Sequence, residues 1–140
     1  QNRAFMVMPI NKDQKLDSLY KDHIKPFLLN DQELKIQTYR ADDFNGNDII
    51  IETIYNQIEQ SEFIITDISM PNKNVFYELG WASAMEKEII TIQNQDVEQN
   101  VFFDRSHIRA RFYSLNNIPE LLRQLKNYII AIRQKTDAKN

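Results

Sequence analysis

Residues 63–80, FIITDISMPNKNVFYELG, decide the fold. Phe63 to Ser69 is an apolar run broken by one acid, a pattern that predicts a buried strand ending at Asp67. Asn74 to Gly80 then opens a segment with helical spacing. A strand that passes directly into a helix is the repeating unit of a parallel sheet. We therefore expect Asp67 and Glu78 to meet at one edge of such a sheet.

The alternation of short apolar runs with longer helical segments continues on both sides. Strands are predicted at residues 4–8, 34–39, 63–69, 88–93 and 110–113, and helices at 16–28, 50–58, from 74 onward and at 118–132. Pro26 predicts a kink or an early end in the first helix, and Asn47 or Asp48 is a suitable N-cap for the second. Residues 94–107 lack periodicity and predict a long loop. This pattern predicts an α/β, flavodoxin-like three-layer sandwich with a five-stranded, mostly parallel sheet in the order 2-1-3-4-5.

Composition fits one globular domain. The chain has 140 residues, which we divide into a single domain at 1–135 and a polar tail at 136–140, and either end could be a cut from a longer protein. With 17 basic and 20 acidic residues the net charge is -3, which gives little support to non-specific nucleic-acid binding. The absence of cysteine excludes thiolate chemistry and fits a cytoplasmic protein.

Other site classes are excluded by what the chain lacks. The apolar stretch at 4–10 is too short for a membrane span. Two glycines in the whole chain leave no glycine-rich phosphate loop. Two isolated histidines give no metal-ligand spacing, so we expect no metal site and no bound cofactor.

The predicted topology places a ligand site beyond the carboxyl ends of strands one and three, where the strand order reverses. If Asn74 is the N-cap, Glu78 lies in the first helical turn, where backbone amides favour an ionised carboxylate. A fixed carboxylate there could stabilise, or attack, a sugar that gains positive charge as its N-glycosidic bond breaks. We predict Glu78 and Asp67 as catalytic residues. The predicted substrate-binding residues are Pro9, Ile10, Arg40, Asp42, Asn74, Tyr77 and Trp81.

Simpler interpretations stand beside several of these assignments. Arg40 could bind a phosphate or form a salt bridge with a neighbouring acid. Asp42 could be a turn or N-cap residue, and Asp67 could brace the loop that leads to Asn74. Gly80, inside a helical pattern, suggests the close approach of a strand or ligand.

Four blocks together resemble bacterial domains of the nucleoside 2-deoxyribosyltransferase-like or TIR-like kind. They are Phe5-Met6-Val7-Met8-Pro9-Ile10, Arg40-Ala41-Asp42-Asp43, Phe63 to Ser69, and Asn74 to Ala82. The resemblance implies that Glu78 is the nucleophile or catalytic acid and that Asp67 contacts the nucleoside. It also implies a nucleotide or nucleoside substrate, with NAD as a candidate, and a homo-oligomeric bacterial defence effector joined to a sensor domain.

Two functions of different classes remain open. One is an enzyme that cleaves an N-glycosidic bond, either as an NAD glycohydrolase or by nucleoside 2-deoxyribosyl transfer. The other is a non-catalytic module that binds a nucleotide signal or assembles with copies of itself. The second is motivated by Met8-Pro9-Ile10, which stands where transferases usually carry a tyrosine or similar polar group.

Overall fold

The fold is a five-stranded sheet covered by helices on both faces. The computed structural model describes residues 2–44, 51–70, 72–96 and 109–139. All strand pairs are parallel, and their order is β2-β1-β3-β4-β5, which confirms the predicted topology. The strands are β1 (Arg3–Val7), β2 (Gln37–Arg40), β3 (Phe63–Asp67), β4 (Glu88–Asn94) and β5 (Ala110–Tyr113).

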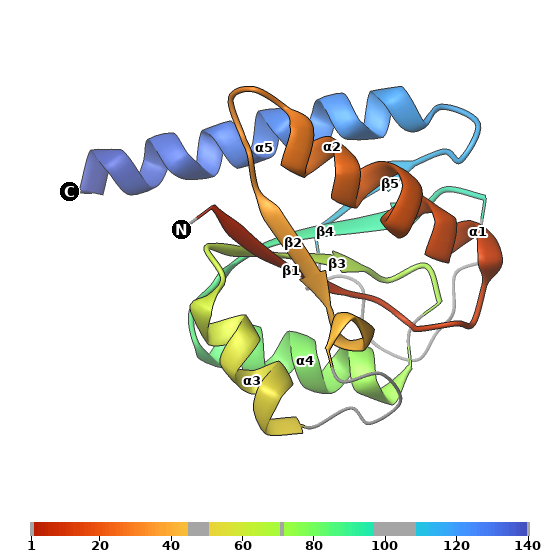
Figure 1. The fold of residues 1–140 in the computed structure, drawn as a ribbon, viewed down its shortest axis with the longest axis horizontal. Helices are drawn as coiled ribbons and strands as arrows, with labels where there is room; N and C mark the ends of the chain where they lie inside the picture. The colour runs from red at the N-terminus through yellow and green to blue at the C-terminus, as the bar shows by residue number, and fades with distance from the viewer. Residues whose placement is uncertain (1, 45–50, 71, 97–108, 140) are drawn as a thin grey trace.

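The helices divide between the two faces of the sheet (Figure 1). One face carries α1 (Gln14–Ser18), the π-helical turn η1 (Leu19–Ile24), α2 (Lys25–Asn30) and α5 (Ile118–Lys139). The other carries α3 (Ile51–Gln60) and α4 (Lys73–Ala84), and a short 3₁₀ turn η2 (Ala41–Asp43) follows β2. Among the described helices, none combines the length and apolar character needed to cross a membrane.

Alternation along the strands sorts the core into two layers. Phe63 and Ile65 of β3 pack in the layer that includes Tyr20 of η1 and Leu125 of α5, which we call the α5 layer. Ile64, between them, packs in the other layer with Val75 and Ala82 of α4, which we call the α4 layer. The layer that a strand residue enters is therefore set by its odd or even position.

The first helix differs from the prediction at Pro26. It neither ends nor breaks there, because the preceding residues widen into the π-helical turn. The Lys25 N–H donates to the Tyr20 carbonyl, five residues back. Proline has no N–H and its ring crowds the carbonyl four residues earlier, so a wider turn accommodates it.

Other element ends also shift. Lys35 has a φ of 48°, so β2 begins at Gln37, although Leu34 and Ile36 are buried as predicted. The terminal helix continues past residue 132 to Lys139, into the predicted polar tail. The predicted cap at Asn47 or Asp48 and most of the predicted 94–107 loop lie outside the described residues.

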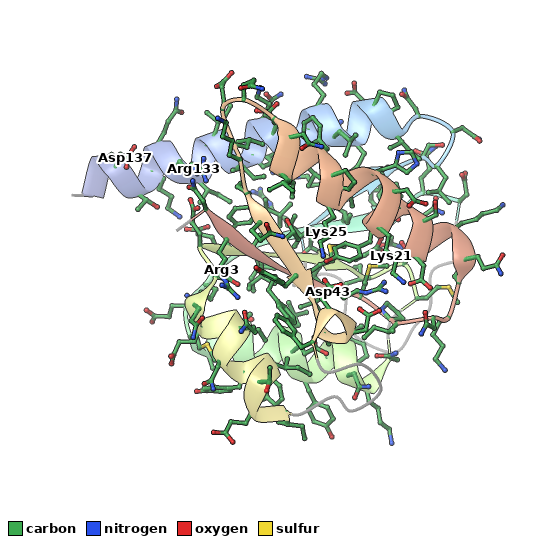
Figure 2. The ribbon with its side chains drawn as sticks, in the orientation of Figure 1. Arg3, Lys21, Lys25, Asp43, Arg133 and Asp137 are labelled. Atoms are coloured by element: carbon green, nitrogen blue, oxygen red, sulfur yellow. The ribbon has the colours of Figure 1, made fainter. Side chains whose placement is uncertain are left out.

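Salt bridges tie the amino edge of the sheet to α5. Arg133 donates from Nε and Nη2 to Glu62, just before β3, at 2.9 and 3.1 Å. These hydrogen bonds hold the pKa of Glu62 below its usual value, against the effect of burial. Arg133 and Arg3 both lie at this edge in Figure 2. The opposite, carboxyl edge is left for the candidate site.

Candidate functional site

Glu78 lies in the second turn of α4. The helix begins at Lys73, and the Asn72 side chain is the N-cap, accepting the Val75 N–H at 3.0 Å. The predicted cap, Asn74, is wrong: it is an exposed residue inside the first turn. Asn72 is the N-cap because its extended backbone lets its side chain reach the amide three residues further along the chain.

The Glu78 side chain faces the sheet. It lies three residues after Val75 and four before Ala82, so the three share the face of α4 that packs in the α4 layer. Glu78 is only 8% exposed. No hydrogen bond or ion pair of its carboxyl group is found in the part of the chain that the structure describes.

Burial raises the pKa of Glu78 to about 7. The sequence predicted an ionised carboxylate that first-turn amides stabilise. This prediction is wrong, because the helix dipole acts within the first turn and Glu78 lies beyond it. A carboxyl group with this pKa exchanges its proton near neutral pH. It can act as an acid, a base or a nucleophile at small cost in protonation.

Asp67 ends β3 and points the other way. It shares its face with Phe63 and Ile65, in the α5 layer, and it is fully buried. The Tyr113 hydroxyl donates to its Oδ2 at 2.6 Å and the Ser69 N–H donates to its Oδ1 at 2.8 Å. Burial raises the pKa of Asp67, and the hydrogen bonds from Ser69 and Tyr113 act against that rise.

The structure therefore does not bring Asp67 and Glu78 together. Their side chains enter opposite layers of the core, and no hydrogen bond joins them. The prediction that the two carboxyl groups converge is wrong, because side chains alternate along a strand and α4 covers the face of β3 that carries Ile64 and Thr66. The bracing alternative for Asp67 matches what is found, since its Oδ1 holds the next turn of the chain.

Arg40 and Asp42 form the salt bridge that was the alternative to phosphate binding. The fully buried guanidinium donates to both oxygens of Asp42, at 2.6 and 2.7 Å, and to Asp17 at 2.7 Å. Burial alone would lower the pKa of Arg40, but these carboxylates outweigh it and raise the pKa. Asp43 is joined to Lys25 at 3.2 Å nearby (Figure 2). Arg40 is thus occupied by protein partners.

The remaining predicted binding residues lie in the loop after β1 and on α4. Pro9 is buried after β1, and Ile10 packs against the α4 layer. Tyr77 is 61% exposed on the outer side of α4. Trp81 contacts the Tyr55 ring edge-on, with ring centroids 5.9 Å apart. Ile10 and Trp81 are thus the predicted binding residues that pack against the same layer as Glu78.

No known protein-family model matches this sequence, and no curated protein matches it. Solved structures do share its fold. One is the CMP N-glycosidase BcmB of Clostridium botulinum, with a TM-score of 0.63 and 22% identity over 90% of this chain and 98% of that chain. Another is a 2-deoxyribosyltransferase from Leishmania mexicana, with a TM-score of 0.53 and 17% identity over 66% of this chain and 65% of that chain. The likeness to deoxyribosyltransferases is confirmed for the fold, whereas the TIR-like part stays a prediction.

Sequence reasoning missed Thr66. Its hydroxyl is buried and has no hydrogen-bond partner among the residues that the structure describes, and its position in the strand puts it on the face of β3 that α4 covers. A buried hydroxyl without a partner is rare enough to mark a site of interest. Strand alternation predicts that Thr66 and Asp67 point to opposite faces of the sheet. It selects Thr66 only when the face that α4 covers is known.

The close approach of a strand to Gly80 is not found. Gly80 is exposed, and a Cβ added to it would meet no atom of the described residues within 4 Å, while the approach of a ligand stays a prediction. Within the described residues, no cluster of three or more His, Asp or Glu side chains could hold a metal ion.

Proposed function

We propose that this protein cleaves the N-glycosidic bond of a nucleoside or nucleotide, with Glu78 as the reacting carboxylate. The observation that carries the proposal is the burial of Glu78 on the inner face of α4, which raises its pKa to about 7. Carboxyl groups with strongly shifted pKa values are concentrated at functional sites. The shared fold of an N-glycosidase and a deoxyribosyltransferase supports the same chemistry.

The chemistry follows from the charge that develops on the sugar. As the bond from C1′ to the base nitrogen breaks, its electron pair leaves with the base and positive charge spreads over the ring. The ionised form of Glu78 would stabilise that charge or form a bond to C1′. Water then gives hydrolysis, and a second base gives transfer. A mostly apolar surrounding strengthens this stabilisation because it lacks competing water.

Less evidence supports the more specific versions of this activity. Nucleoside 2-deoxyribosyl transfer is supported by the sequence blocks and by the fold of one structural neighbour. NAD hydrolysis in a bacterial defence effector, with self-assembly and a sensor domain, is supported by the sequence resemblance alone. The absence of cysteine supports action in the cytoplasm.

A non-catalytic nucleotide-binding module is the second candidate. The observation in its favour is the direction of Asp67, which leaves Glu78 without the acidic partner that was expected beside it. Such a module would bind a nucleotide without breaking its glycosidic bond.

Turnover assays decide between these candidates. The wild-type protein and the Glu78→Gln variant are incubated with CMP, with a deoxynucleoside plus a free acceptor base, and with NAD, and released base is measured by chromatography. We expect base release from at least one substrate, with a loss of at least about 100-fold in Glu78→Gln. Release that survives this substitution would remove Glu78 from the chemistry. Calorimetric binding without turnover, equal in both proteins, would favour the module.

A further inference from the structure

Four residues fasten the connection between β3 and α4, and we call them the Asp67 network: Asp67, Ser69, Asn94 and Tyr113. Tyr113 O–H and Ser69 N–H donate to the two oxygens of Asp67, at 2.6 and 2.8 Å. The Asn94 N–H donates to Ser69 Oγ at 2.7 Å. The network therefore joins the carboxyl ends of three neighbouring strands.

The network is more polar than the core around it requires. Asp67 is fully buried, and no salt bridge to it occurs among residues 2–44, 51–70, 72–96 and 109–139. Taking a carboxyl group out of water is costly, and well-packed apolar residues often serve stability equally well. Hydrogen bonds have directions that apolar contacts lack. This arrangement therefore specifies the position of a chain segment in addition to filling space.

The segment that it positions leads directly to Glu78. Ile68 N–H donates to the Ile92 carbonyl at 3.0 Å, and Ser69 is held on two sides. Three residues later Asn72 caps α4, through hydrogen bonds from the Val75 and Phe76 N–H groups at 3.0 and 3.2 Å. From Lys73 to Glu78 the chain is helical, a rise of about 7.5 Å at 1.5 Å per residue. A shift at the network would therefore be carried to Glu78.

We propose that Tyr113, acting through Asp67 and Ser69, is a positioning residue that sets the start of α4 and thereby the place of the Glu78 carboxyl group. Its effect on catalysis rests on the proposed function, whereas its effect on the helix start does not. In this proposal Asp67 braces the β3–α4 connection and does not touch the substrate. Tyr113 comes from β5, 46 residues after Asp67, so the constraint joins distant parts of the chain.

Tyr113→Phe tests the proposal because it removes one hydroxyl and keeps the ring. A misplacement of about 1 Å in a reacting group can cost about 100-fold in rate. With the substrate that the wild type cleaves, we expect kcat to fall by about 10- to 100-fold, with KM within about 2-fold of the wild type. The matched control is Tyr128→Phe on α5, since no hydrogen bond of the Tyr128 hydroxyl is found within the described segments. It should keep wild-type kinetics.

The pH profile separates positioning from loss of folded protein. Because stability itself changes with pH, each rate is first divided by the folded fraction that circular dichroism measures at that pH. A displaced α4 exposes Glu78 more, so the pH at which kcat/KM is half-maximal should move from near 7 towards the ordinary glutamate value. An unmoved profile with unchanged kcat, or a raised KM with unchanged kcat, would overturn the proposal.

Ser69→Ala gives a second route to the same test if Tyr113→Phe folds poorly. It removes the oxygen that accepts the Asn94 N–H. If both residues act on one connection, the kcat loss of the double variant is smaller than the product of the single losses. Independent, multiplicative losses would contradict the proposal.

Amide hydrogen exchange provides a readout that needs no activity. We expect the Val75 and Phe76 amides, in the first turn of α4, to exchange at least about 10-fold faster in Tyr113→Phe and at the wild-type rate in Tyr128→Phe. Unchanged exchange would overturn the positioning role even in an active enzyme. If the wild type cleaves none of the N-glycosides, the proposed function fails, and the exchange result alone then decides whether Tyr113 positions α4.

Discussion

Glu78→Gln should stabilise the folded protein at alkaline pH. Glu78 is 8% exposed, and burial raises the pKa of its carboxyl group from 4.5 to about 7. Below pH 4.5 the group is protonated in both the folded and the unfolded chain, so it adds no charge penalty. As the pH rises from 4.5 to 7, the unfolded chain loses the proton and the folded chain keeps it. The free energy of unfolding therefore falls across this range and is level above it.

The magnitude follows from the size of the shift. A change of 2.5 pKa units corresponds to about 3 kcal/mol, at 1.36 kcal/mol for each unit. Glutamine has nearly the same shape and carries no charge, so it removes this penalty. The variant should match the wild type near pH 4 and exceed it by about 3 kcal/mol at pH 8. For a chain of this size that is a rise of about 10 °C in Tm.

Urea unfolding followed by circular dichroism, at intervals from pH 4 to pH 8.5, measures the difference directly. Glu59→Gln on α3 is the matched control, because its side chain is exposed and the change should stay within about 0.5 kcal/mol at every pH. A variant that is less stable than the wild type at pH 8 would refute the reasoning. It would show that Glu78 is ionised and stabilised in the folded protein, which is what a first-turn position would predict.

Three further outcomes are expected. Gly80→Ala should raise the free energy of unfolding by about 0.5–1 kcal/mol in the same assay, because the added methyl group meets no atom within 4 Å and alanine is the better helix former; a loss of stability would contradict this. Arg40→Ala should lower it by about 3 kcal/mol, since it leaves Asp17 and Asp42 without their partner, and a change below about 1 kcal/mol would show that the pairs are weak. If ionised Glu78 is the reacting form, kcat/KM should rise with pH through about 7 and level off above it, and a rate that falls over this range would assign Glu78 to the acid role.

The topology could be predicted from the sequence because its signals are redundant. Five apolar runs alternate with helical segments, and the rules for parallel sheets leave few ways to order them. Single residues are less constrained. Asn72 and Asn74 are equally good N-caps by residue type, and only the backbone conformation at Asn72 selects it. That choice moves Glu78 from the first turn to the second.

The shift of two residues reverses the electrostatics of the candidate site. In the first turn a carboxylate gains from unpaired amides, and its pKa falls. In the second turn, facing the core, the same group loses its hydration without that gain, and its pKa rises to about 7. The first-turn prediction thus had the direction of the Glu78 pKa shift reversed, while the catalytic role of Glu78 stays a prediction. The interaction of Arg40 was better constrained, because two acids lie within three residues of it.

The separation of Asp67 from Glu78 has a similar cause and a larger consequence. A strand side chain enters one of two layers according to odd or even position, and the sequence does not show which layer α4 covers. Asp67 enters the α5 layer, where Tyr113 and Ser69 hold it, and Thr66 enters the α4 layer with Glu78. Among the described residues, the Glu78 carboxyl group thus has no hydrogen-bond partner, whereas the Asp67 carboxyl group is occupied by Tyr113 and Ser69. If Glu78 is the reacting group, such a site stabilises charge by fixed position, so its rate should depend on the Asp67 network, although less strongly than on the acid itself.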